Sequence, residues 1–262
     1  MFERRIAFEE SVLRRSYYRL EASKLRRYEQ EECPKFATNF TVSKLDAERL
    51  TTIAPGAKTF VVANGVDTRY FARTAHPVDP KKIVMVSGMN WFPNRDAVTY
   101  FLRDIWPGIS LARPDAKLQI VGASPPEEVT SAARKDARID VTGFVDDVRP
   151  YMSSSAVCVC PMRDGGGTRL KILDALSMGL PIVATSMAIE GIDIEHEREV
   201  LIGDSAAEFA KQVNRLLEDS VLRDRLSASG RAFVEKHFSW PVIGAKLKAE
   251  CQRIAQRRQN AL

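Results

Sequence analysis

One stretch constrains the fold of this chain more than any other, because it reads as strand, glycine loop, helix and strand in succession. It begins with the apolar run 156–160, which is typical of a buried parallel strand. Three consecutive glycines at 165–167 follow, and Thr168 stands where it would cap a helix. The leucines of 170–176 line one face of that helix, and the next strand begins at Ile182.

Such a unit favours an anionic ligand. The N-terminus of a helix presents open backbone N–H groups, and glycines let a ligand approach the backbone closely. Arg163, Arg169 and Lys171 add positive charge at the same place. We interpret the stretch as a binding site for the diphosphate of a nucleotide, with a plain tight turn as the alternative explanation of the glycines.

Composition is that of an ordinary globular protein, with 45% hydrophobic and 28% charged residues among 262. The chain contains no apolar run of about 18 residues that could span a membrane. Residues 1–5 carry mixed charge with no apolar segment behind them, unlike a secretory signal. We therefore expect a cytoplasmic protein.

The formal net charge of +5 suits a polyanionic ligand or an anionic membrane surface. No basic stripe interleaved with aromatic residues is present, so we expect no nucleic-acid partner. Cys158 and Cys160 alternate along one strand and are too close in sequence for an unstrained disulfide. With only three scattered histidines besides, we expect buried core cysteines and no metal site.

The rest of the chain alternates between strand and helix patterns. Strands are expected at 36–42, 59–63, 83–88, 117–122, 139–144, 156–160, 182–185 and 199–202. Helices are expected at 1–32, 44–52 (capped by Ser43), 95–105, 126–135, 148–155, 206–217, 220–230, around 234 and at 240–258. This alternation predicts an α/β fold, a Rossmann-like doubly wound parallel sheet that binds ligands at the carboxyl ends of its strands.

Several segments together resemble one family, the retaining glycosyltransferases of the "glycosyl transferases group 1" class (family 4). In chain order they are Ala63–Asp67 with Phe71, Ser87–Gly88 with Trp91–Asp96, Gly143–Asp147, Gly165–Val183 and Phe238–Trp240. The resemblance covers residues 36–255. It implies a GT-B-type architecture, in which two Rossmann-like domains face a cleft.

The resemblance also implies an activity. Members transfer a sugar from a nucleotide sugar to an acceptor with retention of anomeric configuration, without a cofactor or a metal. The donor would be a UDP-, GDP- or ADP-sugar, and the acceptor a saccharide or a lipid-linked saccharide. The chain would divide into an acceptor-side remnant (1–66), a linker (67–81), a nucleotide-sugar-binding domain (82–238) and a closing helix (239–262) that returns toward the N-terminal part.

Residue roles follow from the same resemblance. Two acids of the family motif correspond to Gly166, where the acid facing the sugar is missing, and Asp174, which would bind the ribose hydroxyls. Arg95 and Lys171 would act as catalytic residues by neutralising the donor diphosphate as it departs. The alternatives are a solvated Arg95 and a Lys171–Asp174 pair on the helix surface. The expected nucleotide-binding set is Gly88, Asn94, Gly143, Phe144, Val145, Gly165, Gly166, Gly167, Thr168, Arg169, Leu170 and Asp174.

Too little chain precedes Asn64 for a full acceptor domain. We therefore expect this chain to carry mainly the donor-binding half, with acceptor-side groups placed before Met1, and to bind nucleotide while transferring sugar poorly. Unpaired strand edges around 36–62 would favour self-association. Peripheral contact with the inner face of a membrane stays an open alternative, because such enzymes often act on lipid carriers.

Two other functions remain open. One is a non-catalytic nucleotide-binding or assembly module, which the short N-terminal part and Gly166 favour. The other is a dinucleotide-dependent oxidoreductase, against which no G-x-G-x-x-G motif opens a first strand–helix turn.

Overall fold

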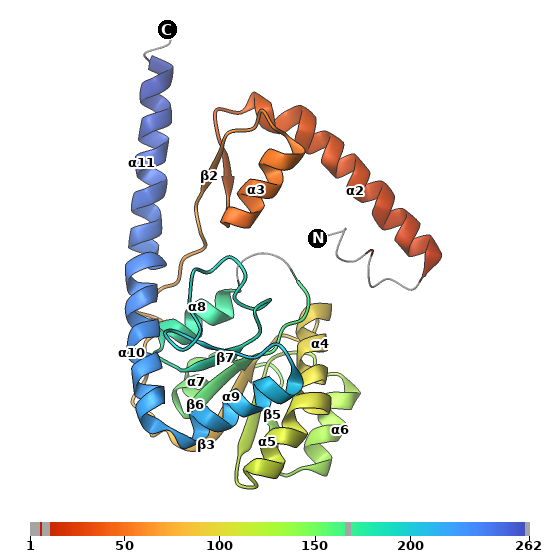
Figure 1. Ribbon diagram of the computed structural model, residues 1–262, viewed down its shortest axis with the longest axis vertical. Helices are drawn as coiled ribbons and strands as arrows, with labels where there is room; N and C mark the ends of the chain where they lie inside the picture. Colours follow the sequence, from red (N-terminus) through yellow and green to blue (C-terminus); the bar gives the residue numbers. More distant parts are fainter. Residues whose placement is uncertain (1–5, 7–10, 166–168, 260–262) are drawn as a thin grey trace. The chain divides into compact units, whose positions relative to one another are not determined.

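The computed structural model describes residue 6 and residues 11–165 and 169–259. The chain forms two compact units (Figure 1). The six-stranded unit comprises Gly65–Arg163 and Arg169–Trp240, and the two-stranded unit comprises Met1–Asn64, Asp164–Thr168 and Pro241–Leu262. The assignment of donor-side and acceptor-side roles to parts of the chain stays a prediction.

The six-stranded unit is built on a parallel sheet whose strand order is β5-β4-β3-β6-β7-β8. The strands are β3 (Asp79–Val86), β4 (Lys117–Val121), β5 (Ile139–Val141), β6 (Ser155–Cys160), β7 (Ile182–Ala184) and β8 (Leu201–Ile202). Counted from the first strand of this unit, the order is that of the doubly wound Rossmann fold. The predicted fold class is therefore confirmed, and the order reverses between β3 and β6.

Helices follow the strands in the alternation that the sequence predicts. They are α4 (Phe92–Tyr100), η2 (a π-helix, Phe101–Ile105), α5 (Trp106–Ala112), α6 (Glu127–Lys135), α7 (Arg149–Ser153), α8 (Leu170–Ser177), α9 (Ala206–Glu218) and α10 (Ser220–His237). Helix α5 packs on α9, and α8 packs on α10. The rings of Phe101 and Phe209, both fully buried, meet edge to face at 6.2 Å and join η2 to α9.

The two-stranded unit holds a parallel pair, β1 (Asn39–Thr41) with β2 (Thr59–Val61). Its helices are α2 (Val12–Glu32), η1 (Cys33–Lys35) and α3 (Lys44–Ile53), which Ser43 caps as predicted. Helix α11 (Trp240–Gln259) begins where the six-stranded unit ends. Over the described residues, none of the helices combines the length and apolarity needed to cross a membrane.

The structure corrects several predicted boundaries. The helix predicted over 1–32 is wrong at Ser11, which has extended backbone and caps α2. Strand β3 begins at Asp79, inside the predicted linker. The helix predicted to end at 105 continues through the π-helical turn of η2 into α5 and ends at Ala112.

Gly230 does not end a helix as predicted, since α10 runs unbroken from Ser220 to His237. A Cβ at this glycine would lie 2.7 Å from Leu176 Cδ2. The residue is therefore small because α10 passes close to α8. The cap of α10 is Asp219, whose side chain accepts from Leu222 N.

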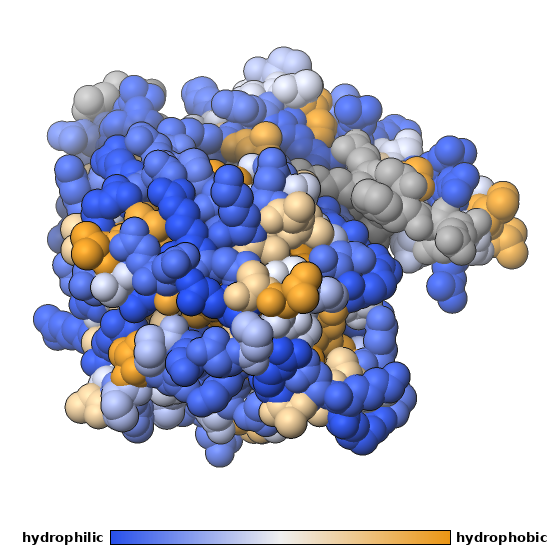
Figure 2. Space-filling view, turned by 60° about the horizontal axis from the view of Figure 1, so that its bottom comes forward, coloured by the Kyte–Doolittle hydropathy of each residue, from blue (hydrophilic) through white to orange (hydrophobic). Residues whose placement is uncertain are grey.

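Surface and core are distributed as the composition suggests. Hydrophilic residues cover most of the face drawn in Figure 2, and hydrophobic residues stand on it in small separate groups. Cys158 and Cys160 are buried and free, as predicted. Burial raises the pKa of the Cys158 thiol to about 12, so this thiol stays neutral and unreactive.

The carboxyl ends of three strands converge through backbone hydrogen bonds. Ser87 N donates to Val121 O at 2.8 Å, and Gly122 N donates to Gly143 O at 3.0 Å. Gly122 has a φ of +156°, and a Cβ there would lie 2.0 Å from Ser87 O. Only glycine permits this approach, which fixes the loops after β3, β4 and β5 against one another.

Gly122→Ala is expected to lower the free energy of unfolding by ~3 kcal/mol, because the added methyl group collides with fixed backbone. Thermal or urea unfolding of the purified chain measures the change. Gly244→Ala on α11 is the matched control, since nothing lies within 4 Å of a Cβ there, and it should stabilise by about 0.5–1 kcal/mol. Equal effects of the two substitutions would contradict the role given to Gly122.

Candidate functional site

The candidate site lies in the six-stranded unit, where the strand order reverses. Ligands of doubly wound folds bind outside the carboxyl ends of the strands at this point. The loop that begins at Ser87 follows β3, and α8 follows β6. Both segments carry residues that the sequence predicted to bind a nucleotide.

Asn94 connects the β3 loop to α8. Its Nδ2 donates to Gly88 O at 2.8 Å, and its Oδ1 accepts from Lys171 Nζ at 2.9 Å. Ser87 Oγ adds a longer bond of 3.4 Å to Asn94 O. Three predicted site residues, Gly88, Asn94 and Lys171, are thus brought together although they are far apart in the sequence.

Lys171 is half-buried in the first turn of α8. Its ammonium group bonds to Asn94, and the described residues include no ion pair between it and Asp174. The alternative of a Lys171–Asp174 surface pair is therefore wrong. An ammonium that makes one hydrogen bond to a neutral amide keeps its positive charge uncompensated by that contact, which suits an anionic ligand.

Asp174 lies one turn after Lys171 on the same face of α8. Its side chain is half-buried, and burial raises the pKa of its carboxyl group from 3.8 to about 7. No hydrogen bond or ion pair to this carboxyl group is present within 11–165 and 169–259. A carboxylate kept in such surroundings gains from hydroxyl groups that donate to it, as the 2′- and 3′-hydroxyls of a ribose would.

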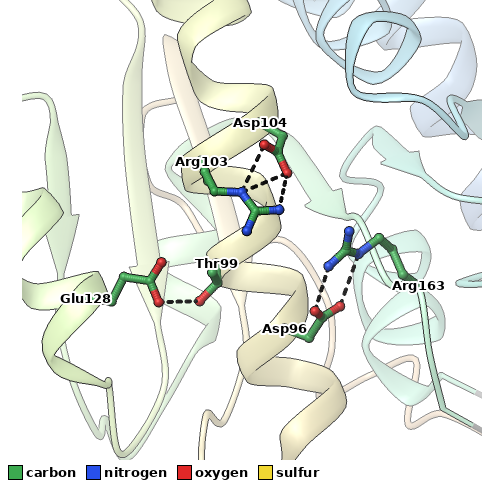
Figure 3. A network of polar contacts seen from close by, with 6 residues as sticks. All are labelled: Asp96, Thr99, Arg103, Asp104, Glu128 and Arg163. Atoms are coloured by element: carbon green, nitrogen blue, oxygen red, sulfur yellow. Dashed lines mark hydrogen bonds and ion pairs between the residues drawn. The ribbon is translucent and has the colours of Figure 1, made fainter. Parts of the chain in front are cut away.

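Arg163, just after β6, is held by α4 (Figure 3). Its guanidinium binds both carboxylate oxygens of Asp96, at 3.1 and 2.6 Å, and lies 4.1 Å from the centroid of the Tyr100 ring. From the sequence, Arg163 is predicted to add positive charge for the ligand. That expectation is corrected, because Asp96 neutralises it and the pair fixes the chain as it leaves β6.

Other predicted residues occupy different surroundings. Arg95 is exposed on α4, and over the described residues its side chain makes no hydrogen bond or ion pair. Gly143 has a φ of +71°, and its carbonyl oxygen accepts a hydrogen bond from Gly122 N. Phe144 is 75% exposed and Val145 half-buried. The structure thus links Asn94, and not Arg95, to Lys171.

The glycine loop is only partly described. Gly165 is buried with a φ of +119°, and its N–H donates to Asp164 Oδ1 at 2.6 Å. The predictions for Gly166, Gly167 and Thr168 lie outside the described residues. The N-cap position of α8 belongs to Arg169, which is buried.

The apolar face predicted for α8 needs one correction. Leu173 and Leu176 are buried as predicted, but Leu170 is 50% exposed. As the first residue of the helix, Leu170 precedes the turn that packs on α10.

The α4 residues that hold Arg163, and Gly122, are not predicted as part of the site from the sequence. Asp96 and Tyr100 are spaced four residues apart on α4, so they share the face that meets Arg163. The spacing can be read from the sequence, but no local pattern identifies Arg163 as the partner of these two residues. Gly122 directly follows β4, and a glycine at the end of a strand pattern is a signal of close backbone approach.

Comparison with known proteins identifies the family. The family model "Glycosyl transferases group 1" matches residues 80–219, more than half of the chain. This chain belongs to that family. The match includes β3 to β8 together with Asn94, Lys171 and Asp174.

The individual relatives have low sequence identity to this chain. A GDP-mannose-dependent monoacylated alpha-(1-6)-phosphatidylinositol monomannoside mannosyltransferase of Corynebacterium glutamicum is 27% identical over 164 residues, 54% of this chain and 40% of that protein. A phosphatidyl-myo-inositol mannosyltransferase of Mycobacterium tuberculosis is 27% identical over 234 residues, 84% of this chain and 61% of that protein. The chain therefore spans less than two thirds of the length of either relative.

Among solved structures, a glycosyltransferase from Rickettsia africae superposes with a TM-score of 0.72 at 16% identity. The superposition covers 88% of this chain and 67% of that one. At this identity the likeness establishes the fold alone, which is that of the GT-B glycosyltransferases.

The raised pKa of Asp174 makes a stability prediction. Between about pH 4 and 7 the unfolded chain has lost this proton while the folded chain keeps it, so stability falls as pH rises through this window. Asp174→Asn removes the ionisable group, and with it this fall in stability as pH rises. The variant should match the wild type near pH 4 and exceed it at pH 8 by about 2 kcal/mol, less than full burial would give because the group is half-buried.

Urea unfolding at the two pH values measures this difference. Asp136→Asn is the control of opposite sign, because bonds from Arg138 and Trp106 lower the pKa of Asp136. That variant should be less stable than the wild type at pH 8. An Asp174→Asn effect of equal size at pH 4 and pH 8 would refute the raised pKa of Asp174.

Proposed function

We propose that this chain binds the nucleotide of a nucleotide sugar at the carboxyl ends of β3 and β6, as the donor-binding part of a retaining glycosyltransferase. The observation that carries the proposal is the link from Gly88 through Asn94 to Lys171, with Asp174 one turn further along α8. It presents a cation and a hydroxyl-accepting carboxyl group on one helix face.

Lys171 supplies the electrostatic part of the chemistry. Its Nζ has three N–H donors and uses one on Asn94, so it can bond to a diphosphate while Asn94 holds it in place. Negative charge grows on the diphosphate as the glycosidic bond breaks. A cation fixed in advance stabilises that charge without reorganisation. Exposed Arg95 would approach the same phosphates only as a second, mobile cation.

Asp174 supplies the nucleoside part. Its carboxyl group accepts hydrogen bonds from the two ribose hydroxyls, which compensate the burial of its charge. Binding of nucleotide is thereby coupled to loss of the Asp174 proton, and affinity should rise with pH through about 7. The glycine at 166 leaves the sugar-facing acid of the family missing, so sugar contact would depend on other groups.

The named relatives suggest a donor. One is described as GDP-mannose-dependent and the other as a phosphatidyl-myo-inositol mannosyltransferase. GDP-mannose is therefore the first donor to test, followed by UDP- and ADP-sugars. The proposed acceptor is a saccharide or a lipid-linked saccharide, reached at the inner face of the membrane in the cytoplasm. Product NMR would establish whether the anomeric configuration is retained.

Calorimetric titration with GDP, UDP, ADP and NAD tests the nucleotide site. Asp174→Ala and Lys171→Met should each lower nucleoside diphosphate affinity by about tenfold or more, since each removes a hydrogen bond to a charged group. Lys211→Met, at an exposed position on α9, is the matched control and should leave affinity within about twofold.

The outcomes separate the competing functions. Binding of NAD alone would favour the oxidoreductase and exclude the proposal. Binding of a nucleoside diphosphate without sugar transfer, by the chain together with any further part of the protein, would favour the non-catalytic module.

A further inference from the structure

Large apolar side chains are exposed beside the candidate nucleotide site. Trp91 and Phe92 stand at the start of α4, with exposed fractions of 36% and 51%. Leu170, the first residue of α8, is half-exposed and directly precedes Lys171. Single exposed apolar side chains are ordinary on a protein surface, whereas several at one place mark a surface that a ligand or a partner covers.

The hydrogen bond between Asn94 and Lys171 joins the starts of α4 and α8. Lys171 Nζ donates to Asn94 Oδ1 at 2.9 Å. Phe92 and Trp91 stand two and three residues before Asn94, which corresponds to a rise of about 3–5 Å along the axis of α4. Both aromatic residues therefore lie within one helical turn of the residue that holds the proposed phosphate-binding cation.

The backbone that carries these two side chains is fixed on both sides. Met89 is buried, and its N–H donates to Ala123 O at 2.9 Å. Pro93 is buried in the first turn of α4, and Arg95 N donates to Trp91 O at 3.1 Å. Trp91 and Phe92 are thus exposed on a backbone that buried neighbours and hydrogen bonds hold in place, as a preorganised contact surface requires.

A sugar ring matches the chemistry of these side chains. A hexose presents C–H groups on the faces of its ring and hydroxyl groups around its rim, so an aromatic ring can pack on a face while the rim stays hydrated. Within 11–165 and 169–259, the indole N–H of Trp91 makes no hydrogen bond, and it can donate to a hydroxyl group at the rim. Aromatic side chains with a few polar groups beside them are typical of small-molecule sites.

The order of the residues along the site indicates which part of the ligand meets the aromatic side chains. This step rests on the proposed function, in which Asp174 binds the ribose and Lys171 the diphosphate. From Asp174 the site continues through Lys171 to Asn94 and the start of α4. In a nucleotide sugar the diphosphate separates the ribose from the sugar, and the nucleobase lies beyond the ribose. The group that follows the diphosphate toward α4 is therefore the sugar.

We propose that Trp91 and Phe92 form the surface on which the sugar ring of the bound donor packs, with Leu170 extending this surface from α8. These residues determine specificity for the sugar and take no part in bond breaking. Their contact provides sugar binding in a chain that has Gly166 at the position where the family resemblance places an acid facing the sugar.

Calorimetric titration of the full chain with matched ligand pairs tests the proposal: GDP with GDP-mannose, UDP with UDP-glucose, and ADP with ADP-glucose. Trp91→Leu and Phe92→Leu should each weaken binding of the nucleotide sugar about fivefold or more, because the aromatic contact is lost. Affinity for the matching nucleoside diphosphate should change by less than about twofold. Trp91→Phe keeps an aromatic ring and should restore most of the affinity that Trp91→Leu loses.

Leu111→Ala is the control, because it removes an exposed apolar side chain from α5 and should leave both affinities within about twofold of the wild type. The inference is overturned if a nucleotide sugar binds and both leucine variants keep the wild-type ratio of the two affinities, whether neither affinity falls or both fall equally. Failure of the wild type to bind any of the three nucleoside diphosphates would instead overturn the proposed function, and this inference with it.

Discussion

The close approach of backbone between Ser87 and Gly122 is the constraint on which the rest of the six-stranded unit depends. A side chain at Gly122 would meet Ser87 O at 2.0 Å, so the loops after β3 and β4 can converge only over a glycine. Convergence places Gly88 within reach of Asn94, and Asn94 within reach of Lys171. Gly122, which has no side chain, thereby helps to position the charged side chain of Lys171.

The charged side chains around the site differ in how far neighbouring groups neutralise them. Arg163 is neutralised by Asp96 and fixed on Tyr100, whereas Lys171 bonds to a neutral amide. Asp174 is half-buried with no hydrogen-bond partner within 11–165 and 169–259. This burial disfavours the charged form and raises the pKa of the carboxyl group. Polar groups left uncompensated in a folded protein are typical of sites that a ligand completes.

The two edges of the sheet also differ in chemistry. The carboxyl edge offers glycines, a cation and a carboxyl group, which match a phosphate with an attached ribose. The amino edge is lined by lysine and aspartate side chains, several of which form exposed ion pairs with one another. A doubly wound sheet makes this separation possible, because each edge is lined by a different set of loops.

The sequence by itself determined the alternation of strands and helices, the glycine loop, and the placement of Lys171 and Asp174 on one face of α8. These features rest on local periodicity and spacing, which a single chain displays. Only the tertiary structure decided that Lys171 bonds to Asn94, that Asp96 neutralises Arg163, that Gly230 lies inside a helix, and that Gln119 donates to Asp140. Such partnerships join positions far apart in the chain, and burial alone sets the pKa of Asp174, so no local pattern encodes them.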